Sequence, residues 1–265
     1  MGVGFQMWDQ DGRMLIDSDR ACAGFARTFV RSGDMGKPAG LRRVYGDGHQ
    51  FLTYRAPEGF ASPLFFFRGP FTVLRYFRRN GNEFTIGWDY WWPTNTPTST
   101  AVLTPPTIVY VFDRMRDMGT GSGLQTFDES GKLTFDSNMG RFRLVGGRHL
   151  NNQEAVDSIT GARVSPDQVR AFDLCDRGKL ALSCGFGRFG TYSPAANSTT
   201  AYYVAEMFRV LDGGRVEVVW AQGGDESYPD ENRFEGVVPT TYGMPFLLAA
   251  NVGDFPEWEW AAPGS

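Results

Sequence analysis

The chain contains few residues of the kinds that carry redox, metal or acid–base chemistry. Among its 265 residues there are three cysteines and two histidines. Three scattered cysteines are too few for a disulfide framework, so we expect thiols and synthesis in a reducing cytoplasm, with a Cys175–Cys184 bridge as the alternative. No CxxC pair, HExxH motif or Walker-type glycine loop is present. We therefore expect no metal, no cofactor and no enzyme activity.

Long apolar runs and basic clusters are also lacking. No apolar run reaches the roughly 18 residues that a membrane-spanning helix needs. The N-terminus has no basic patch followed by an apolar stretch, so neither a membrane span nor a signal peptide is expected. The net charge is −4 and no basic block stands out, which argues against nucleic-acid binding.

Aromatic and turn-forming residues are abundant instead. The chain has 22 Phe and 7 Trp, 15% aromatic residues in all, together with 33 Gly and 15 Pro. Aromatic segments separated by frequent turn formers, with few helical patterns, favour an all-β fold. One helical signal, an N-cap Ser165 followed by Pro166, predicts a short helix over 165–170.

The N-terminal sequence occurs twice. Residues 4–18 read GFQMWDQDGRMLIDS and residues 123–137 read GLQTFDESGKLTFDS. A match this dense, without a gap, predicts an internal duplication and hence two modules, residues 1–118 and 119–265, joined near 114–122. Each module is expected to be a small antiparallel β-sandwich. The identical positions are Gly4, Gln6, Asp9, Gly12, Asp17 and Ser18 in the first copy and Gly123, Gln125, Asp128, Gly131, Asp136 and Ser137 in the second.

The repeated residues are typical of a hairpin turn. We expect Gly12 and Gly131 to adopt a positive φ, and Asp9 and Asp128 to hydrogen-bond their own turn backbone. Turn chemistry explains the repeated aspartates better than metal binding does.

Further strands and turns follow in the same order in both halves. The Asn80-Gly81 dipeptide is a strong hairpin signal, and residues 211–214 stand at the corresponding place in the second half. This alignment makes Trp220 the counterpart of Trp88. The tail, 257–265, is expected to fray or to lie on a neighbour. The strands expected around these turns and at the close of each half are 71–78, 83–90 and 108–113, then 202–210, 215–220 and 245–249.

The sequence Trp88-Asp89-Tyr90-Trp91-Trp92 is the candidate for a surface with a function. Alternate residues of a strand face opposite sides, so Trp88, Tyr90 and Trp92 share one face while Trp91 shares the other with Asp89. Both faces cannot pack into one small core unless something covers the second. Burial in the same chain, the sister module, another subunit or a sugar stacked on the rings would each cover it.

Isolated ionisable residues give weaker signals. His49 and His149 have no catalytic partner nearby in the sequence and are expected in loops or at strand edges. The acidic segment 223–235 could hold calcium, but its spacing does not match an EF-hand loop and an exposed acidic loop needs no ion. A pair of carboxylates for glycoside hydrolysis would have to come from Asp89, Glu206 or Glu217.

The repeated opening, G-x-Q-x-x-D-x-x-G-x-x-x-x-D-S, resembles the start of small structural proteins of tailed bacteriophages. Those proteins are minor tail, tail-tip or tail-fibre components. The resemblance covers about a tenth of the chain, from Gly4 to Ser18 and again from Gly123 to Ser137. The chain lacks the coiled-coil heptads and collagen-like repeats that a long receptor-binding fibre would show.

The resemblance implies a virion protein at the host-attachment end of the tail, made in the host cytoplasm. Its partners would be other phage tail proteins and copies of itself, in a trimer or a sixfold ring, with a host receptor or glycan as a further partner. Strand edges and aromatic patches would become buried against neighbouring subunits. The alternative is a carbohydrate-binding, receptor-recognition module that uses Trp88, Tyr90, Trp91 and Trp92. A glycan-degrading enzyme is the third hypothesis.

Overall fold

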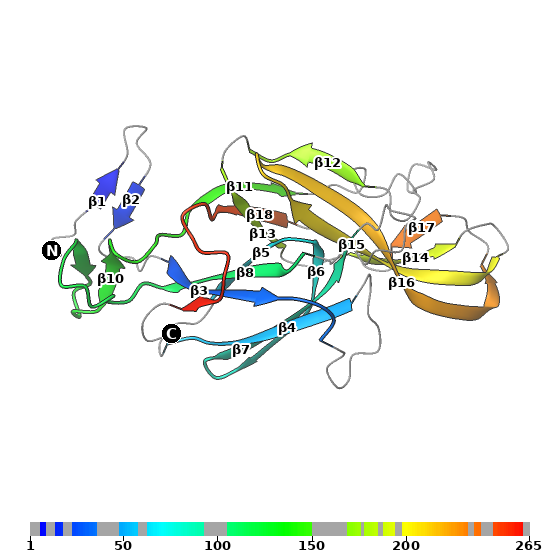
Figure 1. Ribbon diagram of the computed structural model, residues 1–265, viewed down its shortest axis with the longest axis horizontal. Coiled ribbons are helices and arrows are strands. Elements are labelled where there is room, and N and C mark those ends of the chain that lie inside the picture. Colours follow the sequence, from blue (N-terminus) through cyan, green and yellow to red (C-terminus); the bar gives the residue numbers. More distant parts are fainter. Residues whose placement is uncertain are drawn as a thin grey trace.

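The computed structural model (Figure 1) describes residues 6–8, 14–17, 23–35, 48–57, 63–92, 105–149, 169–175, 178–184, 188–193, 198–232, 236–239 and 246–261. Every regular element in these residues is a β-strand. The all-β class expected from the composition is therefore confirmed. The short helix expected over 165–170 is wrong at Arg170, because strand β12 begins there. Residues 165–168 lie outside the described ranges.

The strands follow one another along the whole chain, with the turns and linkers between them. In the first half they are β1 (Gln6–Trp8), β2 (Met14–Asp17), β3 (Ala23–Arg31), β4 (Gly48–Arg55), β5 (Leu64–Arg68), β6 (Phe71–Asn80), β7 (Glu83–Trp91) and β8 (Thr107–Arg114). In the second half they are β9 (Gln125–Phe127), β10 (Leu133–Asp136), β11 (Leu144–His149), β12 (Arg170–Asp173), β13 (Leu180–Cys184), β14 (Phe189–Ser193), β15 (Ser198–Val210), β16 (Arg215–Asn232), β17 (Gly236–Pro239), β18 (Phe246–Asn251) and β19 (Trp260–Ala261).

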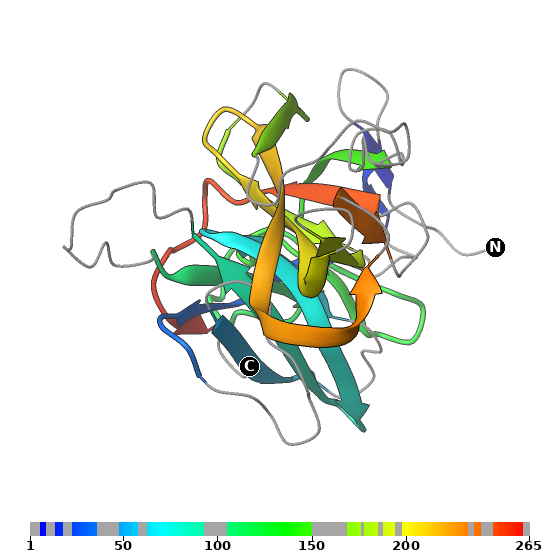
Figure 2. The ribbon, with the colours of Figure 1, turned by 90° about the vertical axis from the view of Figure 1, so that its right-hand side faces the viewer.

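Two large antiparallel sheets contain most of these strands. One has the order β11-β18-β13-β5-β8-β3-β19 and the other the order β12-β16-β15-β6-β7-β4; off this path, β14 pairs with β15 and β17 pairs with β14. The long strands β15 and β16 extend past the sheets and curve at one end of the molecule, to the right in Figure 1 and toward the viewer in Figure 2. The hairpins β1–β2 and β9–β10 form separate two-stranded sheets.

The strand order shows the duplication in three dimensions. The trio β5-β8-β3 of the first half is mirrored by β13-β18-β11 of the second, and β6-β7-β4 by β15-β16-β12. Equivalent strands meet where the halves join, since Phe67 of β5 pairs with Leu182 of β13 and Thr72 of β6 pairs with Phe208 of β15. The two tandem β-sandwich-like modules are thus present, joined edge to edge. The boundary between residues 118 and 119 stays a prediction.

Each module encloses a core between its two sheets. Side chains of β3, β5 and β8 meet those of β4 and β7 in the first core, and side chains of β13 and β18 meet those of β15 and β16 in the second. Contact between side chains of facing sheets is what makes these modules sandwiches. The two counterpart tryptophans are both buried, Trp88 at 0% and Trp220 at 3% exposure.

The turns behave as their residues predict. Gly81 has a φ of +61° between β6 and β7, and Gly213 and Gly214 have φ values of +82° and +85° between β15 and β16. Because L-residues with a side chain rarely adopt positive φ, glycine sets the position of each of these turns.

The C-terminal segment returns across the first module. After β18 the chain runs over the outer face of the seven-stranded sheet and pairs as β19 with β3, the last red segment of Figure 1. Phe25 of β3 is stacked between two of its rings, with centroids 4.3 Å from Phe255 and 5.0 Å from Trp260. The expectation of a frayed tail is therefore wrong as far as residue 261. We call residues 252–261 the C-terminal arm.

Candidate functional site

The aromatic set proposed from the sequence lies mostly inside the protein. Trp88 is 0% and Tyr90 is 4% exposed. The indole of Trp88 donates a hydrogen bond of 2.9 Å to Oε1 of Gln50 and packs edge-on against Phe67. Burial in the same chain, one of the open alternatives, is what these two residues show, so they offer no platform to a ligand.

Trp91 and Trp92 are partly buried at the end of the same strand. Trp91 contacts Phe71 with a centroid distance of 5.4 Å, in the outer-face cluster of the eight-stranded sheet. The guanidinium of Arg209 lies 4.8 Å from the Trp92 ring. These contacts with β6 and β15 tie both rings to the joint between the modules, and a role of the pair at an interface stays a prediction.

Asp89, on the opposite face from Trp88, forms a buried polar cluster. Its Oδ1 lies 2.8 Å from Nδ1 of His49, and its Oδ2 lies 3.2 Å from Nε of Arg75. The sequence separates His49 and Asp89 by 40 positions, so only the pairing of β4 with β7 brings them together. The other ring nitrogen of His49, Nε2, is buried, lies against Gly87 and has no hydrogen-bond partner in the described part of the chain. In the described part of the chain, no serine or cysteine is therefore bonded to this nitrogen, as a nucleophile of a catalytic triad would be.

The other two carboxylates considered for glycoside hydrolysis are each paired with an arginine. Both oxygens of the Glu206 carboxylate accept hydrogen bonds from Arg188, and Glu206 is 0% exposed. Burial raises the pKa of Glu206 to about 7, against the attraction of Arg188, which lowers it. Glu217 accepts from Nε of Arg209 at 2.6 Å. Neither carboxylate is presented to an open groove by this pairing.

The described residues show no cluster of metal ligands. Over the ranges given above, no three His, Cys, Asp or Glu side chains come together as a metal would require. The side chains of the acidic segment 223–235 fall outside the described ones, so the alternative of calcium binding there is untested. His149 lies against the ring of Phe246 at 4.4 Å. Cys175 and Cys184 are thiols at the edge of the second core.

The repeated motif forms the same hairpin in both modules, with the same register and an irregularity at the same place. Its side chains are described in the second copy, β9–β10. The equivalent pairs are Gln6–Asp17 and Gln125–Asp136, Met7–Ile16 and Thr126–Phe135, and Trp8–Met14 and Phe127–Leu133.

The turn of this hairpin is held by Asp128 and Gly131. Oδ1 of Asp128 accepts 2.9 Å hydrogen bonds from the backbone N–H groups of Ser130 and Lys132. Gly131 has a φ of +76°. The turn chemistry predicted for both residues is confirmed.

The base of the hairpin is held by Asp136. Its carboxylate accepts hydrogen bonds from Nε2 of Gln125 at 2.9 Å and from the backbone N–H groups of Asn138 and Met118 at 2.8 and 3.1 Å. Burial works to raise the pKa of Asp136, but these bonds outweigh it and hold the pKa below its ordinary value.

The two remaining repeated residues close the motif. Oγ of Ser137 accepts a 2.8 Å hydrogen bond from the backbone of Leu124. Gly123 has a φ of +110°, and a Cβ there would lie 2.6 Å from Oγ of Ser137. All six residues repeated in the second copy are thus explained by the shape of the hairpin. Its apolar residues Leu124 and Phe127 are 45% and 50% exposed, so this shape presents them to solvent.

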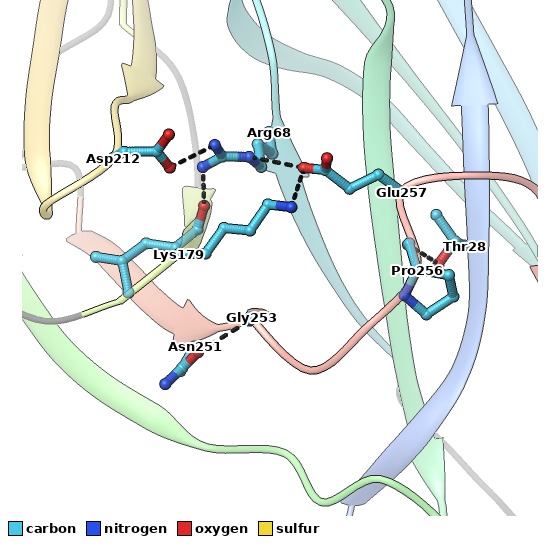
Figure 3. Close-up of polar contacts among 9 residues, drawn as sticks. Thr28, Arg68, Lys179, Asp212, Asn251, Gly253, Pro256 and Glu257 are labelled. Carbon is cyan, nitrogen blue, oxygen red and sulfur yellow. Dashed lines mark hydrogen bonds and ion pairs between the residues drawn. The ribbon is translucent and has the colours of Figure 1, made fainter.

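Charged residues fix the C-terminal arm across the joint between the modules. Arg68, at the end of β5, donates to Oδ1 of Asp212 at 2.7 Å, to the Leu180 carbonyl at 3.0 Å and to Oε1 of Glu257 at 3.2 Å (Figure 3). Lys179 reaches the same Glu257 oxygen at 2.6 Å (Figure 3). One arginine therefore connects the first module, the second module and the arm.

A hollow of about 640 Å³ lies between the arm and the base of the hairpin β9–β10. Gly140 is one of its lining residues, and a Cβ there would lie 2.3 Å from the Phe255 ring. Asn138 and Asp254 are its polar side chains, and its rings are Phe25, Phe255, Trp258 and Trp260. A second hollow of about 280 Å³ shares Gly140, Asp254 and Phe255 and adds Arg141 and Arg143.

Comparison with known proteins gives no relative. No family model, no curated protein and no solved structure matches the chain. No helix long and apolar enough to cross a membrane occurs in the described residues.

Sequence reasoning missed the hollow beside the arm. Its residues come from β3, the hairpin base and the arm, and no local pattern connects these segments. The one signal was Trp258-Glu259-Trp260, in which a strongly apolar residue type recurs at the chain's end among acidic residues.

Proposed function

We propose that the protein is a structural and interaction component of a tailed-bacteriophage tail, at the tail tip or in a tail fibre. It would be made in the host cytoplasm, assemble with copies of itself and other tail proteins, and be located in the virion. The proposal rests on the resemblance of the repeated motif to the start of phage tail proteins, and on the position of the hairpins outside the two large sheets.

The repeated hairpin is the observation that carries this proposal. It is the most similar sequence shared by the two modules, yet it lies outside both large sheets. Its hydrogen bonds keep Leu124 and Phe127 exposed, and the aligned positions in the first copy, Phe5 and Trp8, are also apolar. Both hairpins lie at the same end of the molecule, on the left of Figure 1. A duplicated hairpin that, in its described second copy, exposes two apolar residues suits docking onto neighbouring subunits.

A second surface supports the same function. Strand β11 ends the order of the seven-stranded sheet. Leu144 and Val145 on it are 53% and 37% exposed, beside Phe246 of β18 at 37%. Exposed apolar residues on an edge strand favour pairing with another chain.

The test is the oligomeric state of the purified chain, measured by light scattering after size exclusion. We expect a trimer or a sixfold ring. The Leu124→Ser/Phe127→Ser double variant should dissociate it, because it removes both exposed apolar groups while sparing the turn. Phe77→Ser is the matched control, since Phe77 is 55% exposed at the β6–β7 turn, away from the repeat. A wild-type chain that stays monomeric at all concentrations, alone and with phage tail proteins, would contradict the assembly role.

The virion location has its own test. Antibodies against the chain should label one end of the tail in negatively stained particles of the phage that encodes it. Particles without the chain in their protein content would refute a virion role.

A further inference from the structure

Trp258 is held in place and yet exposed. The residue is 67% exposed, the largest value among the described large hydrophobic residues. Its neighbours on both sides are anchored: Glu257 by Lys179 at 2.6 Å, and Glu259 by Arg31 at 2.6 Å and by the backbone N–H of Val30 at 2.8 Å. Ion pairs on either side fix the backbone beneath an aromatic ring that faces solvent.

The hollow beside Trp258 has the size and lining of a small-ligand site. Its volume of about 640 Å³ falls within the range of about 300–1,000 Å³ that such sites occupy. The rings that form its wall are fixed, because Phe25 is stacked between Phe255 and Trp260. A preformed aromatic wall loses little conformational freedom when a flat ligand binds.

We propose that this hollow binds a neutral pyranose sugar, with one ring stacked on Trp258. A pyranose has an apolar face of C–H groups and a rim of hydroxyl groups, each of which donates and accepts. The indole matches the face. The Asp254 carboxylate is exposed and lines both hollows, so it accepts from the rim of the stacked ring. Arg141 and Arg143 line the second hollow, where they donate to hydroxyl groups that extend into it. The carboxylate and the two guanidinium groups carry opposite charges and offer acceptors and donors beside the aromatic rings. Such a site suits a neutral polyhydroxy ligand better than an ion.

The neighbouring hollow extends the site. It shares Gly140, Asp254 and Phe255 with the first, so a second sugar unit has space next to the stacked one. The site is therefore expected to prefer a disaccharide or longer chain over a single ring.

A protein partner fits the hollow less well. Trp258 is the only residue of its lining among the exposed large hydrophobics of the described chain. Protein interfaces need contiguous apolar patches of several hundred Å², which one indole does not provide. The sugar site is independent of the hairpin contacts, so either proposal can fail without the other.

The test uses the full chain and a panel of methyl glycosides and disaccharides of glucose, galactose, mannose, rhamnose and N-acetylglucosamine. Saturation-transfer NMR identifies binders, and calorimetry then measures their affinity. At least one neutral sugar should bind, and Trp258→Ala should weaken it about tenfold, the equivalent of one lost stacking contact. Asp254→Ala should weaken it several-fold. Because Trp258 is exposed, its variant should keep the wild-type circular dichroism and Tm.

Phe77→Ala is the control for an exposed ring elsewhere, and it should leave binding unchanged. The proposal is overturned if no neutral sugar of the panel binds, or if binding survives Trp258→Ala intact. It is equally overturned if only acidic sugars such as sialyllactose bind, because the class of ligand would then be wrong.

Discussion

Replacement of Arg188 by methionine should leave Glu206 as a buried carboxylate without its guanidinium partner. In the native protein the two side chains form a bidentate ion pair with contacts of 2.5 Å and exposures of 2% and 0%. Breaking a buried pair by removing one member costs about 3–5 kcal/mol, because the remaining charge is neither solvated nor neutralised. We expect the upper part of this range at pH 8, since both oxygens of Glu206 lose their partner. For a chain of this size, the Tm should fall by about 10 °C.

The loss should depend on pH. Burial raises the pKa of Glu206 to about 7 even with Arg188 present, so removal of the arginine, whose charge lowers that pKa, raises it further. When the pKa of a carboxyl group is higher in the folded than in the unfolded protein, its contribution to stability is complete below the unfolded pKa of about 4. This contribution is lost as the pH rises through the folded pKa. The variant should therefore recover stability between pH 8 and pH 5, as Glu206 takes up a proton.

Urea denaturation of wild type and variant at the two pH values measures both effects. Arg209→Met is the matched control, because Arg209 lies on β15, the strand of Glu206, and its partner Glu217 is 13% exposed and can be rehydrated; the loss of stability should be about 1 kcal/mol. The Arg188→Met/Glu206→Leu variant should regain most of the stability. A loss below about 1 kcal/mol for Arg188→Met, or one that is equal at both pH values, would refute the assigned burial and pairing.

Three other changes test the hairpin and the arm. Gly131→Ala should destabilise by about 1 kcal/mol, because alanine is strained at a φ of +76° although no atom lies within 4 Å; an unchanged urea midpoint would contradict the turn geometry. Asp136→Ala should cost about 1 kcal/mol at neutral pH by leaving three part-buried donors unpaired, and the difference from wild type should shrink as the pH falls through the lowered pKa of Asp136. Gly140→Ala should displace the Phe255 ring and release the arm, seen as faster amide exchange over residues 252–261; unchanged exchange there would show that the ring is not held by this contact.

Local patterns are sufficient for the tight turns of this protein and for part of its strands, among them β6, β7, β8 and β15. Asn80-Gly81, the glycines at 213 and 214, and the Asp128–Gly131 turn are each determined by backbone preferences within a few residues. Alternating aromatic segments predict strands such as β6 and β7, and the internal repeat predicts the two modules. The prediction of a helix over 165–170 is wrong at Arg170, because the pairing of β12 with β16 outweighs a weak local capping signal.

The aromatic platform shows where sequence reasoning stops. Trp88 and Trp258 are both tryptophans beside acidic residues, and only one of them is exposed. Trp88 is covered because residues of β4 and β5 pack against it, while Trp258 is open because Glu257 and Glu259 bind arginines on strands far away in the sequence.

The amino-acid sequence by itself determined the all-β class, the duplication and the hairpin that opens each module, since these follow from interactions between residues close together in the chain. Only the tertiary structure decided the edge-to-edge joint of the modules, the His49–Asp89 and Arg188–Glu206 pairs, and the path of the C-terminal arm. Each of these joins segments far apart in sequence, and the free energy that selects them comes from burial of whole surfaces rather than from any local pattern.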